Sequence, residues 1–257
     1  MTLARVSSPT PGQVSLTGER SVRFMSSMPV VLVDLDGTLV DSGPGIAACA
    51  ADAFRAVGRP VPAEAELRSF IGPPIKESLR RSGVPEPELD AAVAGFRSRF
   101  AEMSIIGAKP YPGVRRALEQ LRLDGYRLIL TTSKPEMFAV PICAHFGLDS
   151  LLDGIVGAPP DPATVTKAAI IAKALLDSGG GPAVVVGDRY HDVLGARENG
   201  LDCLGAAWGY AADGELLRAG AVEVILSPDR LVDAVPAYFG NLFQSAISES
   251  GDDLNEG

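Results

Sequence analysis

The sequence has few of the features that define several large classes of protein. No apolar run reaches the roughly 18 residues of a membrane-spanning helix, so we expect no membrane association. Its three cysteines, Cys49, Cys143 and Cys203, form no CxxC or Cys/His cluster, which argues against disulfides or zinc and favours a reducing compartment. Basic residues number 23 against 32 acidic ones, and the net charge of -9 makes nucleic acid an unexpected partner. We therefore expect a cytoplasmic globular protein.

The two ends of the chain are poor in structural signals. Residues 1–28 are rich in Ser, Thr, Pro and Gly and have no apolar stretch typical of a secretory signal. They are predicted to form a flexible leader, with Met25 and Met28 as alternative starts of the native protein. The other end is polar and acidic from Ser248 to Gly257, and residues 241–257 are predicted to be an acidic tail that frays.

Short apolar runs alternate with helical patterns along most of the chain. The runs lie at 30–35, 127–131, 154–157, 183–186, 203–206 and 222–226, and the helical patterns lie at 113–123, 135–146, 163–177 and 192–199. Strands that alternate with helices through short loops predict an α/β fold with a Rossmann-like, doubly wound parallel sheet.

The segment 43–110 breaks this alternation. It has helical patterns at 46–57, 63–70, 74–81 and 87–103, the last being the longest, and no convincing strand. This is too much chain for one crossover helix, so we predict an all-helical cap domain over 43–110, inserted into a core of residues 29–42 and 111–240. The segment has nine basic and eight acidic residues, so it either faces an anionic ligand or forms a solvated surface.

Acidic residues follow two of the predicted strands. Asp34 and Asp36 end the first strand, and Asp188 follows the strand at 183–186, with Asp192 at the start of the next helix. Ligands bind at the carboxyl ends of strands in such sheets, where paired carboxylates would repel each other without a cation. A helix cap would explain Asp192 alone. Clustered carboxylate oxygens suit a hard cation, and the sequence predicts Mg²⁺.

A second group of residues suits a phosphate. Thr132 and Ser133 follow the second strand, just before a helix that begins with Pro135. Hydroxyls and free N–H groups at a helix N-terminus form a phosphate cradle, although Ser and Thr are also ordinary caps. Lys167 opens the helix before Asp188, where the helix dipole disfavours a cation and another purpose is indicated. Lys173, further along, is the competing lysine and is typical of a surface residue.

These four segments, in this order, resemble the motifs of the haloacid dehalogenase (HAD) superfamily of phosphohydrolases. Within it, the chain is most similar to the phosphoglycolate phosphatase-like branch. The resemblance runs from about residue 30 to residue 236 and depends on DxDGTLxDS at 34–42 and GDxxxDxxGA at 187–196. It departs at Ser133, where many relatives carry Asn, and at Lys167, which precedes Ala168 where many relatives have Pro.

The resemblance implies a role for each candidate residue. Asp34 would be the nucleophile that forms an aspartyl-phosphate, and Asp36 would be the general acid and base. Mg²⁺ would be held by Asp34, the backbone carbonyl of Asp36 and Asp188. Asp192 would be a supporting acid that orients water or the lysine. The groups implied to bind the phosphoryl oxygens are Thr132, the Ser133 backbone and Lys167.

The expected function is hydrolysis of a small phosphorylated metabolite, such as phosphoglycolate, a sugar phosphate or a nucleotide. The helical insertion corresponds to the family's cap, where Gly72, Lys76 and Arg80 are the candidates for substrate selection. Alternatives are phosphotransfer to a protein hydroxyl, a phosphomutase and, least favoured, a non-catalytic interaction protein. Thr38 disfavours a mutase because sugar phosphomutases commonly have a Val-like residue there, and Asp36 disfavours cleavage of a carbon–halogen bond. No feature specifies an oligomeric state.

Overall fold

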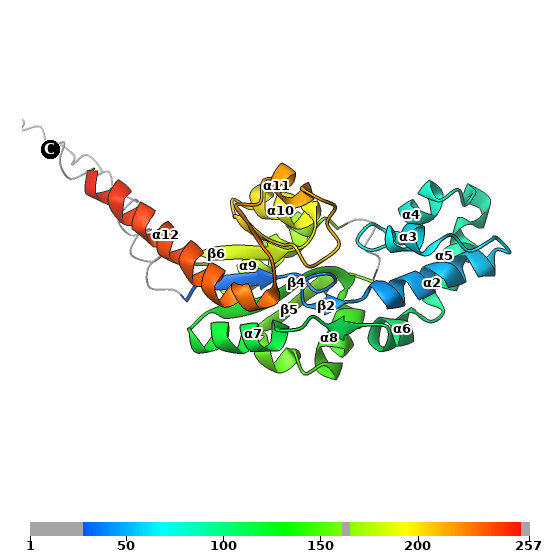
Figure 1. Cartoon of the computed structure of the whole chain (residues 1–257), viewed down its shortest axis with the longest axis horizontal. Coiled ribbons are helices and arrows are strands. Elements are labelled where there is room, and N and C mark those ends of the chain that lie inside the picture. Colours follow the sequence, from blue (N-terminus) through cyan, green and yellow to red (C-terminus); the bar gives the residue numbers. More distant parts are fainter. Residues whose placement is uncertain (1–27, 161–164, 253–257) are drawn as a thin grey trace, which may run out of the picture.

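The computed structural model describes residues 28–160 and 165–252 and contains a six-stranded parallel sheet flanked by helices (Figure 1). The strand order is β5-β4-β1-β6-β7-β8, with the first strand at the centre. This confirms the predicted doubly wound α/β fold. The strands are β1 (Val30–Val33), β4 (Arg127–Pro135), β5 (Gly154–Ala158), β6 (Ala183–Gly187), β7 (Cys203–Ala206) and β8 (Glu223–Ile225).

Each face of the sheet buries a different set of helices. Side chains alternate along a strand, so in β1 Val31 and Val33 face one layer while Val30 and Leu32 face the other. Figure 1 shows α7 and α8 on one side of the sheet and α10 and α11 on the other. The first layer comprises α7 (Val114–Leu123), α8 (Glu136–His145) and α12 (Leu231–Asp252), and the second comprises α9 (Lys167–Ser178), α10 (Tyr190–Glu198) and α11 (Glu215–Ala219).

Several boundaries differ from the predicted ones. Strand β4 continues to Pro135, because Thr132 still pairs with β5 before a β-bulge. Helix α12 extends through the predicted acidic tail to Asp252, and its first half is held by buried side chains such as Val235 and Phe239. The predicted leader lies outside the described residues except for Met28, and so do residues 253–257. No helix in the described ranges is long and apolar enough to cross a membrane.

Between β1 and β4, the chain forms a group of helices with its own apolar cluster, at the right of Figure 1. This cluster supports the proposed division into core and cap. A two-stranded antiparallel ladder of β2 (Val40–Asp41) and β3 (Lys109–Pro110), which the sequence did not predict, joins the segment to the core. The helices are α2 (Gly43–Ala56), α3 (Glu64–Arg68), α4 (Ile75–Arg81), η1 (Glu86–Glu88), α5 (Leu89–Arg97) and α6 (Phe100–Ile106).

The predicted long helix over 87–103 is wrong. The chain breaks at Ser98 and Arg99 into α5 and α6, and α2 is the longest helix of the described segment 43–110. The break lets both short helices pack against α2. Gly95 lies so close to α2 that an added Cβ would be 2.5 Å from the Ala56 Cβ, and Gly107 contacts the backbone of Gly45.

Candidate active site

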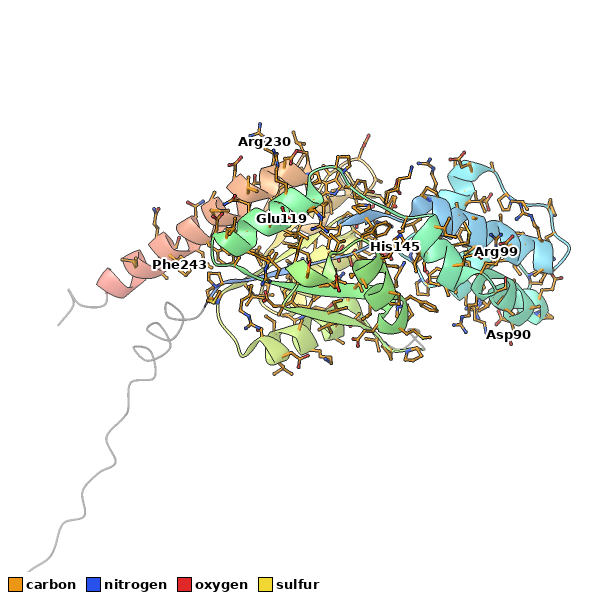
Figure 2. The ribbon with its side chains drawn as sticks, turned by 90° about the horizontal axis from the view of Figure 1, so that it is seen from below. Asp90, Arg99, Glu119, His145, Arg230 and Phe243 are labelled. Atoms are coloured by element: carbon orange, nitrogen blue, oxygen red, sulfur yellow. The ribbon has the colours of Figure 1, made fainter. Side chains whose placement is uncertain are left out.

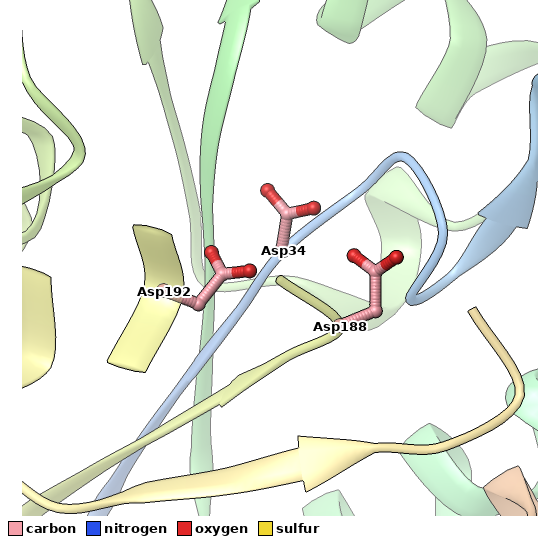
Figure 3. Close-up of side chains that lie close together, drawn as sticks. All are labelled: Asp34, Asp188 and Asp192. Atoms are coloured by element: carbon pink, nitrogen blue, oxygen red, sulfur yellow. The ribbon is translucent and has the colours of Figure 1, made fainter. Parts of the chain in front are cut away.

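The pairing of β1 with β6 brings the predicted acidic residues together. Val33 is in register with Val186, so Asp34 and Asp188 leave the same edge of the sheet from neighbouring strands. Asp192 reaches the same point from the first turn of α10, where its carboxylate also accepts a hydrogen bond from the Arg189 N–H. Figure 3 shows the three carboxylates converging, and one oxygen from each lies within 4.8 Å of the others. The structure thus assembles the acidic cluster that the motifs predict.

Glycines make room for Asp188. Gly37 has φ of +90°, and a Cβ there would collide with the Asp188 carboxylate. Gly209 contacts Asp188 from the loop after β7 and has equally little space for a side chain. The next residue, Tyr210, donates its backbone N–H to the Asp188 Oδ2 at 2.7 Å, and the Thr38 hydroxyl lies 3.4 Å from Oδ1. In the DxDGT segment, Gly37 is therefore required because a side chain would collide with Asp188, and Thr38 provides a polar contact to the same carboxylate.

Lys167 lies in the middle of the acidic cluster. Its side chain is buried, with Nζ 2.5 Å from the Asp34 Oδ1 and 2.6 Å from the Asp192 Oδ1. Nζ also donates to the Thr131 carbonyl at 2.7 Å. The competing Lys173 is exposed and pairs with Asp177 of its own helix. The geometry therefore brings Lys167, and not Lys173, to the acidic cluster, which explains why a lysine opens α9.

Asp36 has a partner that the sequence reasoning did not single out. Lys134 is buried and its Nζ lies 2.9 Å from Oδ1 and 2.8 Å from Oδ2 of Asp36. Lys134 directly follows Thr132 and Ser133. Its place next to the predicted phosphate-binding residues is the one sequence feature that could have identified it. Thr132 is buried and accepts a hydrogen bond from the Lys134 N–H, whereas Ser133 is exposed. Both Thr132 and Ser133 border the same cavity as Asp34.

Burial makes this cluster electrostatically costly without a cation. Burial raises the pKa of Asp34 to about 7, against the attraction of Lys167 and with added repulsion from Asp192. Burial also raises the pKa of Asp188 well above its ordinary value, with repulsion from Asp192 and Asp34 adding to the effect. Among the described residues, Asp188 forms no ion pair. A cation beside Asp34 and Asp188 would favour their charged forms.

The charges of the side chains around the site indicate the charge of the cation that would fit there. Four carboxylates (Asp34, Asp36, Asp188 and Asp192) lie opposite two ammonium groups (Lys134 and Lys167). When a cation keeps all four carboxylates ionised, four negative charges less two positive ones leave two negative charges, which a divalent ion would neutralise. Carboxylate oxygens are the ligands of hard divalent cations, so the donor set fits such an ion.

The acidic cluster opens into a cavity of about 360 Å³ between the sheet and the helices of residues 43–110. Gly72 lines it, as the sequence analysis proposed for a substrate-selecting residue. Lys76 and Arg80 do not: they form exposed salt bridges with Asp90 and Glu86. Figure 2 shows Asp90 on the part of the cap far from α12. Neither side chain therefore borders the cavity in this structure, and a part for Lys76 or Arg80 in substrate selection stays a prediction.

Two arginines line the cavity instead. Arg97 comes from the end of α5 and is exposed. Arg189 precedes α10 and links the two parts of the protein, because it donates to the Ile71 carbonyl at 2.8 Å and pairs with Glu215 at 2.9 Å. No local sequence pattern identified either arginine, since their positions depend on how the helical segment packs on the core.

Comparison with known proteins agrees with this geometry. Residues 31–206 match the family described as haloacid dehalogenase-like hydrolase, and the chain belongs to this family. A solved structure of a predicted phosphatase from Clostridium acetobutylicum superposes with a TM-score of 0.76 at 32% identity, covering 82% of this chain and 100% of that one. The family that the motifs indicated is therefore confirmed.

Three relatives show the range of activities among similar chains. A 5'-nucleotidase of Pseudomonas aeruginosa is 36% identical over 192 residues, or 73% of this chain and 86% of its own length. A phosphoglycolate phosphatase of Cupriavidus necator is 35% identical over 218 residues, which cover 80% of this chain and 90% of that protein. Tyrosine-protein kinase PtkA of Mycobacterium tuberculosis is 37% identical over 186 residues, which is 72% of this chain but 64% of the kinase. The expected class, a phosphoric monoester hydrolase, is confirmed by the phosphatase relatives.

Proposed function

We propose that this protein is a cytoplasmic, Mg²⁺-dependent phosphatase that hydrolyses a small phosphorylated metabolite through an aspartyl-phosphate on Asp34. The observation that carries the proposal is the buried cluster in which Asp34, Asp188 and Asp192 converge at the end of the sheet, with Asp34 and Asp192 lining one cavity. The substrate classes under consideration are a nucleotide, phosphoglycolate and a sugar phosphate. Buried, free Cys49, Cys143 and Cys203 suit a reducing compartment.

The chemistry takes place in two displacements. In the first, a carboxylate oxygen of Asp34 attacks phosphorus, the ester P–O bond breaks, and the leaving oxygen takes a proton from Asp36. In the second, water attacks phosphorus and gives a proton to Asp36, and the bond between phosphorus and the Asp34 oxygen breaks to release phosphate. Lys134 contacts both oxygens of Asp36 and so holds the acid in place between the two steps.

Other groups of the chain would neutralise the transferred phosphoryl group. Lys167 is within reach of Asp34 and would exchange that contact for a phosphoryl oxygen, supported by Asp192. The Thr132 hydroxyl and the Ser133 backbone would bind further phosphoryl oxygens. When bound by Asp34, Asp188 and the Asp36 carbonyl, Mg²⁺ would supply positive charge that offsets the repulsion between carboxylate and phosphate.

The test is phosphate release from a panel of esters by the purified full chain. We expect release from at least one phosphomonoester that requires Mg²⁺ and is abolished by EDTA. Asp34→Asn should abolish turnover, while Asp213→Asn, which alters an exposed acid that does not line the cavity, should not change it. Turnover by Asp34→Asn at the wild-type rate would refute the assignment of the nucleophile.

Transfer to a protein hydroxyl is the second candidate, and the similarity to a tyrosine-protein kinase favours it. The same Asp34-phosphate would then be attacked by a phenol or alcohol oxygen in place of water. Incubation with γ-labelled ATP and candidate proteins would leave label on the acceptor protein if this activity exists. If wild-type and Asp34→Asn proteins give equal labelling, the label comes from a contaminant and this candidate is refuted.

A further inference from the structure

Aromatic side chains form much of the cavity beyond the phosphoryl site. The chain has nine phenylalanines, and four of them line this one cavity. Phe96 and Phe100 come from the cap helices α5 and α6, and Phe138 comes from α8 of the core. The apolar lining comprises Ile46, Phe70, Ile75, Phe96, Phe100, Phe138 and several prolines. Such a wall is unsuited to a small, fully charged ligand.

Three of these rings form a continuous surface. Phe96 and Phe100 stack with their centroids 5.1 Å apart, and Phe100 meets Phe138 edge to face at 5.0 Å. Phe96 is buried beside Phe100. Phe100 and Phe138 are only half-buried, so part of each ring remains accessible to a ligand in the cavity.

The cations of the cavity are already paired. Lys134 pairs with Asp36, Lys167 with Asp34 and Asp192, and Arg189 with Glu215. Among the lysines and arginines that line the cavity in the described part of the chain, Arg97 alone forms no ion pair, and its side chain is exposed. A second anionic group on the substrate would therefore meet phenylalanines or the exposed Arg97. Burying a carboxylate against such a wall is unfavourable.

We propose that this site selects phosphomonoesters whose leaving group carries a flat aromatic ring, which packs against Phe100 and Phe138. The inference rests on the proposed phosphatase function and specifies its substrate class. Aromatic rings gain from both burial and edge-to-face or offset contact with other rings, and each contribution favours a ring-bearing ester over a small polar one. The ring is either a nucleobase joined through ribose or a simple aryl group. Both kinds of ring have the flat apolar face that would pack against Phe100 and Phe138.

The experiment compares matched pairs of esters on the wild-type chain with Mg²⁺. Uridine 5'-monophosphate and ribose 5-phosphate differ in the base, and benzyl phosphate and propyl phosphate differ in the ring. Both members of each pair release a primary alcohol, so the chemistry of the leaving group is similar. We expect kcat/KM at least about tenfold higher for the ring-bearing member of one pair, since aromatic contacts and ring burial together exceed one factor of ten. The pair that shows the preference identifies the source of the ring.

Substitutions of the two rings then test whether they cause the preference for ring-bearing esters. Phe100→Leu and Phe138→Leu should each bring the ratio between the paired esters towards one. Phe146→Leu, which alters a partly buried ring at the end of α8 that packs against the core and does not line the cavity, should keep the wild-type ratio. Competitive inhibition by benzylphosphonate and propylphosphonate, measured on the wild-type chain with any ester that it hydrolyses, gives a second measurement that needs neither turnover of the paired esters nor a folded variant. Tighter inhibition by the benzyl compound is expected.

The results distinguish a failure of the proposed phosphatase function from a failure of the aromatic preference alone. If the chain hydrolyses none of the four paired esters and no other phosphomonoester of the panel, the proposed phosphatase function fails, and this inference fails with it. If propyl phosphate and ribose 5-phosphate are turned over as fast as their ring-bearing partners, or phosphoglycolate exceeds all four in kcat/KM, the phosphatase function stands and the aromatic preference is overturned.

Discussion

Replacing Asp34, the proposed nucleophile, should stabilise the metal-free protein while it abolishes activity. Asp34 is buried, and its pKa is raised from 3.8 to about 7, with burial as the main cause. In the unfolded chain the carboxyl group loses its proton near pH 4, whereas in the folded chain it keeps the proton until about pH 7. Between these values the folded state binds more protons than the unfolded state, so stability falls as the pH rises. Asparagine has the same shape and no proton to lose.

The size of the effect follows from the pKa difference. Each pH unit between the two pKa values costs about 1.4 kcal/mol, which gives about 4 kcal/mol by pH 7 and about 2 kcal/mol at pH 5. The free energy of unfolding of Asp34→Asn, relative to wild type, should therefore increase by about 2 kcal/mol from pH 5 to pH 7. Lys167 keeps Asp192 and the Thr131 carbonyl as partners in the variant.

Urea denaturation in the presence of EDTA measures this difference. Wild type, Asp34→Asn and the exposed control Asp213→Asn would be unfolded at pH 5 and pH 7, and the free energies extrapolated to water. The control should show no change in its difference from wild type between the two pH values. A difference between Asp34→Asn and wild type that is the same at both pH values would refute the reasoning.

Three further substitutions test individual contacts. Lys167→Met should lower kcat at least about a hundredfold, whereas Lys173→Met should change it less than about twofold; equal effects would contradict the assignment. Gly37→Ala forces a methyl group against Asp188 and should weaken Mg²⁺ binding in calorimetry, and wild-type affinity would argue against Asp188 as a ligand. Arg189→Met removes a hydrogen bond between core and cap and should raise KM more than it lowers kcat in steady-state kinetics; a pure kcat effect would point to a different role.

The parts of the site that could be predicted from sequence are those set by local pattern. Asp34 and Asp188 each end a short β-branched run, and parallel strands necessarily end at the same edge of a sheet. Lys167 could be predicted because a lysine at a helix N-terminus is electrostatically unfavourable without a nearby acid. The structure brings all three together.

The missed features depend on contacts between distant segments. Lys134 is close to Asp36 only because β4 lies beside β1, and a lysine at the end of a strand gives no sign of its partner. Phe100 reaches the cavity because the helical segment breaks at Ser98, where periodicity predicted one continuous helix. Lys76 follows the turn at 70–74, and nothing in the sequence indicates that it pairs with Asp90 of α5 and does not line the cavity.

The most direct test of the account is to find the phosphoryl group on the protein. Wild-type chain would be mixed with a hydrolysed ester and Mg²⁺, quenched in acid within one turnover, digested and analysed by mass spectrometry. The account predicts one phosphoryl group on the peptide that contains Asp34, removable by hydroxylamine and missing from Asp34→Asn. Rapid turnover with an unmodified Asp34 peptide, or with the phosphoryl group on another residue, would contradict it.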